Sequence, residues 1–207
     1  MAQYKLYYFD GFKGRAELAR FVFAQADVQY EDIRLSREQW AEVKPSSPWK
    51  VMPFLEVDGE RIGGSSVIGR FLAERFGLGG EGDIERAKIA AAGDAVNDLA
   101  SNVIQKIYEE KDEAKKEEIK KEILEKKLPS ILGSFEEKII NNGTPEGWLY
   151  TKKVTWADFS IVLVLDWLDL TLPGALKDYP GIAKLRDSVN NLPNIKKWIA
   201  ARPKTQF

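Results

Sequence analysis

The chain has 207 residues, a formal net charge of −1 at pH 7, and neither cysteine nor histidine. This length suffices for one large domain or two small ones, and the near-neutral charge gives no support for binding to nucleic acid or to an anionic membrane. The missing residue types exclude disulfides, thiolate nucleophiles, serine triads and the usual zinc sites, so we expect no metal. Catalysis would have to use tyrosine, serine, charged side chains or main-chain amides.

The N-terminus lacks a secretory pattern, and no apolar run approaches ~18 residues. We therefore expect a cytoplasmic protein without a membrane partner.

The first part of the chain, to about residue 77, alternates strand and helix patterns. The expected elements are strands over 4–9 and 28–34, helices over 15–26 and 37–43, a hairpin over 54–62, and a helix from Ser65 to about Phe76. The dipeptide Asp58–Gly59 predicts a type I′ turn within the hairpin. This order predicts a mixed sheet flanked by helices, an α/β domain.

The glycine-rich segment 77–82 is the expected domain boundary. We expect one domain over 1–77, a linker over 78–83 and an all-α domain over 84–207. The expected helices of the second domain are 84–109, a stretch over 112–142 that Pro129 kinks or ends, 156–168, 181–191 and 194–201. Thr155 and Asp158 match a capping pattern at the start of the helix over 156–168, which is apolar nearly all round and should be buried.

A densely charged run extends from Glu109 to Lys127, with nearly equal numbers of acidic and basic residues. A solvent-exposed helix face is the simpler interpretation, because a contact with nucleic acid would need net positive charge.

The end of the first strand is the first candidate for chemistry. A phenol at a strand end, facing a helix start and Arg15, can hold a thiol as a thiolate. Because the chain has no cysteine, the thiol must come from another molecule.

Several motifs follow one another in fixed order along the chain: Tyr4–Phe9 with Gly14–Glu17, Trp40 with Lys44, Val51–Gly59, Ser65, Thr155–Phe159 and Lys197–Thr205. Together they resemble the motifs of the sigma-class glutathione transferases, and the resemblance covers essentially the whole chain. The resemblance implies a thioredoxin-like domain that binds glutathione, followed by an all-helical domain.

The resemblance implies that Tyr8 and Arg15 are the catalytic residues. A free thiol has a pKa of ~8.5, and a hydrogen bond given to the thiolate lowers that pKa. A phenol is protonated at neutral pH and can donate this bond. Strand alternation places Tyr7 and Tyr8 on opposite faces, so at most one of them points into the site. The alternative for Tyr8 is a core tyrosine, and the alternative for Arg15 is a surface arginine. The turn from Asp10 to Gly14 is one residue longer than the sigma pattern, which bears on how Tyr8 and Arg15 lie relative to each other.

The resemblance also implies where glutathione binds. Trp40 and Lys44 would hold the glycine carboxylate, and Ser65 with the helix start would hold the glutamyl carboxylate. The Met52–Pro53 bond would be cis, which presents the main chain of Met52 to the cysteinyl part of glutathione like an added strand. The remaining residues of the implied binding set are Tyr8, Arg15, Lys50, Val51 and Gly64.

Two positions depart from the family pattern. Gly64 stands where the family usually has glutamine, and Lys50–Val51 stand where it commonly has Gly-Gln or Gly-Lys. Losing a hydrogen bond to a charged group costs about 1.5–3 kcal/mol, or about ten- to a hundredfold in affinity. Lys50 adds positive charge near the ligand, and main-chain contacts from residues 51–52 do not depend on side chains, so we expect binding that is weaker than usual.

The resemblance further implies a homodimer. Asp98 would reach the glutamyl amine of glutathione in the other subunit, although a solvent-exposed helix carboxylate is an equally good interpretation. The electrophile would bind among Phe9, Phe12, Ser101, Asn102 and Gln105.

The expected function is transfer of glutathione to small hydrophobic electrophiles, with prostaglandin isomerase or peroxidase activity as possible additions. The alternative is a crystallin-like structural protein or ligand carrier on the same fold. The departures from the family pattern at Gly64 and Lys50–Val51 are of the kind expected in a protein that has lost catalysis. Glutathione is the co-substrate in the first interpretation.

Overall fold

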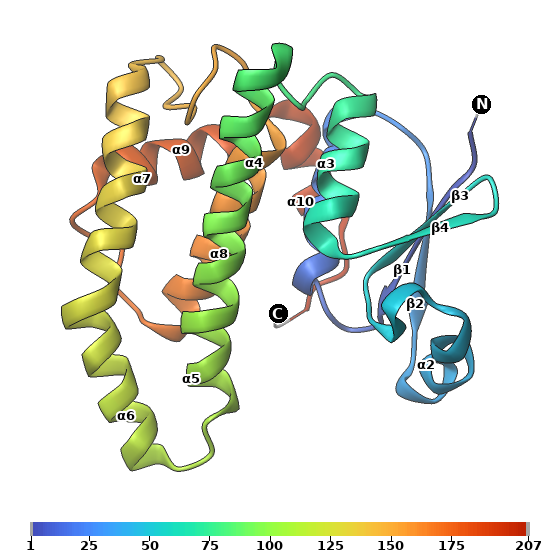
Figure 1. Ribbon diagram of the computed structural model, residues 1–207, viewed down its shortest axis with the longest axis horizontal. Coiled ribbons are helices and arrows are strands. Elements are labelled where there is room, and N and C mark those ends of the chain that lie inside the picture. The colour runs from blue at the N-terminus through green and yellow to red at the C-terminus, as the bar shows by residue number, and fades with distance from the viewer. Residues whose placement is uncertain (1, 206–207) are drawn as a thin grey trace. The chain divides into compact units, whose positions relative to one another are not determined.

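The computed structural model describes residues 2–205, and these form two structural units (Figure 1). The first unit combines residues 2–79 with 192–205, and the second comprises residues 80–191. The segment from residue 192 onward packs with the first unit, and its expected membership of the helical domain stays a prediction. The last helix, α10 (Pro193–Ala201), contacts α1 (Glu17–Ala26), and the side chain of Ile195 is fully buried.

The first unit contains a four-stranded mixed sheet, as the sequence predicted. The strands are β1 (Tyr4–Phe9), β2 (Glu31–Leu35), β3 (Phe54–Val57) and β4 (Glu60–Gly63), in the order β2-β1-β3-β4. β1 pairs with β2 in parallel, whereas the β1/β3 and β3/β4 pairs are antiparallel.

The second strand begins three residues later than predicted. Asp27 ends α1 in a left-handed conformation with φ of 53°, and the Val28 N–H donates to the Phe23 carbonyl. This is a helix-terminating turn of the Schellman type, so Val28 is used for capping rather than pairing.

The hairpin turn matches its prediction. Asp58 and Gly59 both have positive φ, at 51° and 94°, as a type I′ turn requires. The turn is tied to the start of the chain, since the Gln3 N–H donates to the Asp58 carboxylate over 2.8 Å.

Helices α1 and α3 (Ser65–Arg75) contact each other and the sheet. Tyr4 packs edge-on against Phe23 of α1 and against Phe76, and Leu6 is fully buried. The first helix is preceded by a single 3-10 turn, η1 (Gly14–Ala16), and α2 (Arg37–Val43) begins with a capping box between Ser36 and Gln39. Two further 3-10 turns, η2 (Lys44–Ser46) and η3 (Pro48–Lys50), lead toward β3.

The second unit is helical. Its elements are α4 (Gly82–Leu99), a π-helical turn η4 (Ala100–Ile104), α5 (Gln105–Glu109), α6 (Glu113–Glu122), a second π-helical turn η5 (Ile123–Lys127), α7 (Leu128–Asn142), α8 (Trp156–Thr171) and α9 (Pro180–Asn191). The helix changes from π to α geometry just before Pro129, where η5 passes directly into α7 and Lys127 and Leu128 both keep helical φ and ψ. Pro129 has no N–H to continue the ladder, and it lies at the start of α7, where none is needed.

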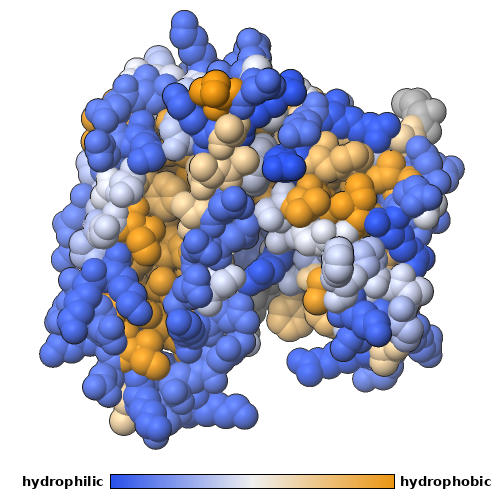
Figure 2. All heavy atoms as spheres, in the orientation of Figure 1, coloured by the Kyte–Doolittle hydropathy of each residue, from blue (hydrophilic) through white to orange (hydrophobic). Residues whose placement is uncertain are grey.

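Helix α8 supplies the core of this unit, as its apolar sequence predicted. All of its residues from Trp156 to Val162 are buried, and the capping box between Thr155 and Asp158 is formed. Figure 2 shows mainly hydrophilic residues over α6, as expected for the charged run, and over the outer surface of α7, with a stripe of hydrophobic residues beside them. In the described part of the chain, none of the helices has the length and apolar composition that a bilayer crossing requires.

Candidate functional site

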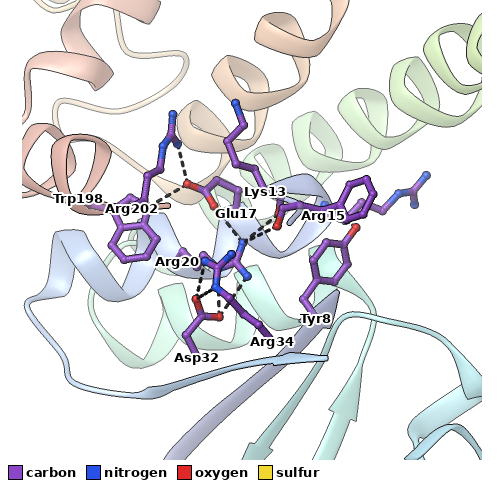
Figure 3. Close-up of polar contacts among 10 residues, drawn as sticks. Tyr8, Lys13, Arg15, Glu17, Arg20, Asp32, Arg34, Trp198 and Arg202 are labelled. Atoms are coloured by element: carbon purple, nitrogen blue, oxygen red, sulfur yellow. Dashed lines mark hydrogen bonds and ion pairs between the residues drawn. The ribbon is translucent and has the colours of Figure 1, made fainter. Parts of the chain in front are cut away.

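Tyr8 lies on β1, with its ring on the opposite side of the strand from Tyr7. Tyr7 stacks on Phe54 of β3, with ring centroids 4.3 Å apart and planes 11° apart. The Tyr8 hydroxyl instead reaches the start of the first helical turn, where its oxygen accepts a hydrogen bond of 3.2 Å from the Arg15 N–H (Figure 3). Strand alternation had predicted this separation of the two phenols.

Arg15 meets Tyr8 through its main chain, which the sequence analysis had not specified. The approach depends on Gly14, whose φ is 47° and whose position leaves no room for a side chain. A Cβ atom at Gly14 would lie 2.4 Å from the Tyr8 hydroxyl oxygen. In this turn it is the Arg15 N–H that faces the phenol.

The Met52–Pro53 peptide bond is cis, as the resemblance implied. Pairing of Tyr7 with Phe54 places Pro53 next to Tyr8 at the same end of the sheet. The Pro53 carbonyl accepts a hydrogen bond of 3.2 Å from the Gly64 N–H, which brings the start of α3 to this point.

Gly64 is the N-cap of α3 and Ser65 is its first residue, so Ser65 does not occupy the N-cap position. Gly64 has φ of 97°, a conformation that L-residues rarely adopt. The first N–H groups of a helix have no intrahelical acceptor, so this end of α3 can bind an anion.

Trp40 of α2 lies against Phe9 at the end of β1, with ring centroids 6.1 Å apart in an edge-on arrangement. Lys44 is exposed at the C-terminal end of α2. Lys50 and Val51 are exposed in the segment before β3, and Lys50 has φ of 54°. The family's glycine at the Lys50 position is suited to that left-handed conformation, which a lysine adopts at a cost of roughly 1–2 kcal/mol.

The remaining expected residues divide between the two units. Phe12 is partly exposed in the turn before η1 of the first unit. Asp98 is exposed on α4, whereas Ser101 and Asn102 lie in the π-helical turn η4 and Gln105 begins α5. The electrophile pocket that Phe9, Phe12, Ser101, Asn102 and Gln105 would line stays a prediction.

Arg20 is a component of this region that the sequence analysis missed. Its side chain is fully buried in α1, and its guanidinium contacts two carboxylates, Asp32 at 3.1 Å and Glu17 at 3.2 Å (Figure 3). The guanidinium carbon also lies 6.0 Å from the Tyr8 ring centroid, which is a cation–π geometry. The available signal was a single cation inside the apolar run from Leu18 to Phe23.

Tyr30 lies beside the same charges. Burial, reinforced by the Asp32 carboxylate, raises the pKa of the Tyr30 hydroxyl, and the Arg20 guanidinium opposes this effect. Tyr30 therefore stays protonated, and its ring stacks on Phe23 with centroids 4.2 Å apart.

One end of the sheet thus combines the cis-proline loop, the start of α3 and the Tyr8 phenol, whose oxygen already accepts a hydrogen bond from the Arg15 N–H. A hydroxyl oxygen that accepts an N–H bond can still donate its proton, and such chains of hydrogen bonds strengthen one another. This arrangement can stabilise an anion presented to the phenol. Among residues 2–205, no group of carboxylates has the spacing to hold a metal ion.

Comparison with known proteins identifies the family. Residues 97–202 match the family described as "Glutathione S-transferase, C-terminal domain". The chain is 38% identical to glutathione S-transferase 1 of Ascaris suum, with 100% of both chains covered, and 38% identical to hematopoietic prostaglandin D synthase of Gallus gallus, with 99% of each covered. The solved structure of prostaglandin synthase D of Nilaparvata lugens has a TM-score of 0.88 and 36% identity, covering 98% of this chain and 99% of that one. The chain therefore belongs to the glutathione S-transferase family.

Proposed function

We propose that this protein is a sigma-class glutathione transferase that transfers glutathione to small hydrophobic electrophiles. The observation that carries the proposal is the 3.2 Å hydrogen bond from the Arg15 N–H to the Tyr8 hydroxyl oxygen. It fixes the phenol at the start of the first helical turn and leaves the phenolic proton to donate to a sulfur anion.

In this proposal the Tyr8 hydroxyl lowers the pKa of the glutathione thiol by donating to its thiolate form. The thiolate sulfur attacks an electrophilic carbon, a sulfur–carbon bond forms, and the leaving group departs with its electron pair. Holding both reactants together supplies further acceleration through proximity. A phenol suits this role because it is protonated at neutral pH and can therefore donate a hydrogen bond.

Glutathione would bind along the first unit, beside Tyr8. The main chain of Met52 would pair with its cysteinyl part, the start of α3 at Ser65 would take the glutamyl carboxylate, and Trp40 with Lys44 would take the glycine carboxylate. The hydrogen bond between Gly64 and Pro53 supports this assignment, since it brings the loop and the helix start to the same end of the sheet.

The proposal includes a homodimer in which Asp98 contacts glutathione in the other subunit. The exposed position of Asp98 on α4 leaves its carboxylate available for such a contact. Sedimentation equilibrium would measure the assembly. Asp98→Asn should raise the KM for glutathione and leave the assembly unchanged. A monomer at micromolar concentration would contradict this part.

The central test is Tyr8→Phe, which removes the hydroxyl and keeps the ring. Conjugation of chlorodinitrobenzene should fall at least about tenfold, because one hydrogen bond to a charged group is worth about 1.5–3 kcal/mol. The acid limb of the kcat–pH profile should move to higher pH, since the bound thiol loses its donor. Tyr7→Phe is the matched control: it changes the same chemical group on the other face of the strand and should leave the profile unchanged.

The outcomes separate the proposal from its alternative. Unchanged activity in Tyr8→Phe would show that another group activates the thiol. If the natural protein folds but shows no turnover, the structural or carrier function is favoured instead. The relatives, which are named as a transferase and a synthase, do not favour that outcome. Assays with a prostaglandin endoperoxide and with an organic hydroperoxide would then show whether isomerase or peroxidase activity accompanies conjugation.

A further inference from the structure

The turn that contacts Tyr8 is held by a buried cation. The Arg20 Nη1 donates to the main-chain carbonyl oxygens of Phe12 and Lys13, at 3.4 and 3.1 Å. The same guanidinium is fixed by Asp32 and by Glu17, and its side chain is 0% exposed. A buried charge bonded on several sides has little freedom to move, so the carbonyls of residues 12 and 13 are fixed relative to α1.

This turn leads directly to the hydrogen bond on the phenol. Gly14 follows Lys13, and the next N–H, that of Arg15, donates to the Tyr8 hydroxyl oxygen at 3.2 Å. Because 3.2 Å is already at the long end for such a bond, a small displacement of the turn would weaken it. The position of the Tyr8 hydroxyl therefore depends on Arg20.

Glu17 connects Arg20 to the last helix of the chain. Its carboxylate is almost fully buried, and one oxygen, Oε2, accepts from Arg20. The other oxygen, Oε1, accepts from the indole Nε1 of Trp198 at 2.9 Å and from Nη1 of Arg202 at 2.7 Å (Figure 3). All of these residues belong to the first structural unit.

We propose that Trp198 and Arg202 are positioning residues for Tyr8, acting through Glu17 and Arg20 on the turn that ends at Arg15. The inference rests on the proposed function, in which the Tyr8 hydroxyl holds the glutathione thiolate. Removing a donor from Glu17 frees its carboxylate to rotate, and Arg20 then loses part of the contact that fixes the turn. The thiolate is consequently less stabilised, although neither Trp198 nor Arg202 touches it.

Two variants each remove one donor from Glu17. Trp198→Phe keeps an aromatic ring and removes the indole N–H, whereas Arg202→Met keeps the length of the side chain and removes the guanidinium. Each should lower kcat for chlorodinitrobenzene about five- to tenfold, with the KM for glutathione changed less than about twofold. The midpoint of the acid limb of the kcat–pH profile should move to higher pH by up to about one unit, because a tenfold loss of thiolate corresponds to one pH unit. The ultraviolet absorption of the bound thiolate should titrate in parallel.

Arg202→Lys tests rescue. Only one guanidinium nitrogen, Nη1, bonds to Glu17, so a lysine ammonium can replace it. The lysine variant should recover most of the kcat and of the thiolate signal. Asn194→Ala is the matched control, because Asn194 also ties α10 to α1, through the Gln25 carbonyl at 3.2 Å, without touching Glu17. It should lower the melting temperature and leave the thiol titration unchanged.

A double-mutant cycle tests whether Arg202 acts on the thiol through Tyr8. In the Tyr8→Phe background, Arg202→Met should produce no further shift of the thiol titration, because the group through which it acts is gone. The inference is overturned if Trp198→Phe and Arg202→Met fold and titrate like the natural protein, or if Asn194→Ala shifts the titration equally. If Tyr8→Phe itself leaves the titration unchanged, the proposed function fails instead.

Discussion

Gly14 and Tyr8 lie so close together that a methyl group on Gly14 would come within 2.4 Å of the phenol oxygen. Gly14→Ala should therefore displace the Tyr8 hydroxyl or the turn that follows it. Overpacking of this kind typically costs about 1–3 kcal/mol, and we expect a loss of conjugation rate of at least about tenfold. Steady-state kinetics and urea denaturation of the same preparation would measure both effects.

Gly11→Ala provides the control for backbone strain. Gly11 also has positive φ, at 76°, but a Cβ there would meet nothing within 4 Å. Both variants therefore carry a left-handed alanine, at a cost of roughly 1 kcal/mol, and only Gly14→Ala adds the collision with the phenol. Equal kinetic losses in the two variants would mean that the shape of the turn, rather than the contact with Tyr8, controls the rate.

Asp158 joins two segments of the second unit through a buried carboxylate. Oδ1 accepts from the Leu149 N–H at 2.9 Å, and Oδ2 accepts from the N–H and the hydroxyl of Thr155 at 2.7 and 2.9 Å. Asp158→Asn turns one acceptor into a donor that faces another donor. Each buried group left unsatisfied costs about 1–3 kcal/mol, so the free energy of unfolding should fall by that amount.

The same substitution at an exposed cap should have little effect. Asp112 caps α6 by accepting from the N–H groups of Ala114 and Lys115, at 3.0 and 3.1 Å, in solvent. Asparagine caps helices as well as aspartate does, so Asp112→Asn should change the stability by less than about 0.5 kcal/mol. Comparable losses at positions 112 and 158 would contradict the role assigned to burial.

The parts of the fold that the sequence predicted are those set by neighbouring residues. The type I′ turn at Asp58–Gly59, the capping box at Thr155 and the opposite faces of Tyr7 and Tyr8 each follow from spacing over a few positions. The same reasoning placed the second strand too early, because nothing in the sequence shows that Asp27 adopts a left-handed conformation.

The parts of the site that the sequence did not reveal depend on distant partners. Arg20 resembles an isolated cation in an apolar helix until Asp32 and Glu17 are seen to neutralise it. The contact between Glu17 and Trp198 joins residues 181 positions apart, which leaves no periodic signal. For the same reason, nothing local in the sequence shows that α10 contacts α1.

Two glycines in helices of the second unit should respond in opposite directions to alanine. A Cβ at Gly93 of α4 would lie 2.2 Å from the ring of Trp156 in α8, so Gly93→Ala should destabilise the protein by about 1–3 kcal/mol. A Cβ at Gly133 of α7 would meet nothing within 4 Å, so Gly133→Ala should stabilise it by about 0.5–1 kcal/mol through helix propensity. Thermal denaturation should separate the two melting temperatures, and changes of the same sign would contradict the packing argument.

Gly64→Gln tests where the glutamyl end of glutathione binds. A side chain at Gly64 has room, since a Cβ atom there would lie 3.7 Å from its nearest neighbour, Val67 Cγ2, but φ of 97° strains any residue other than glycine. We expect a stability loss of about 1–3 kcal/mol from this strain. A new hydrogen bond from the glutamine amide to the glutamyl end should tighten binding about ten- to a hundredfold.

Gly64→Ala separates the two effects, because it introduces the same backbone strain without an amide. Calorimetric titration with glutathione should therefore show the glutamine variant binding at least about tenfold more tightly than the alanine variant, while denaturation shows similar losses of stability in both. Equal affinities for glutathione in these two variants would place the glutamyl end away from the start of α3. In that case the anion-binding helix terminus next to Pro53 would have to serve another part of the ligand.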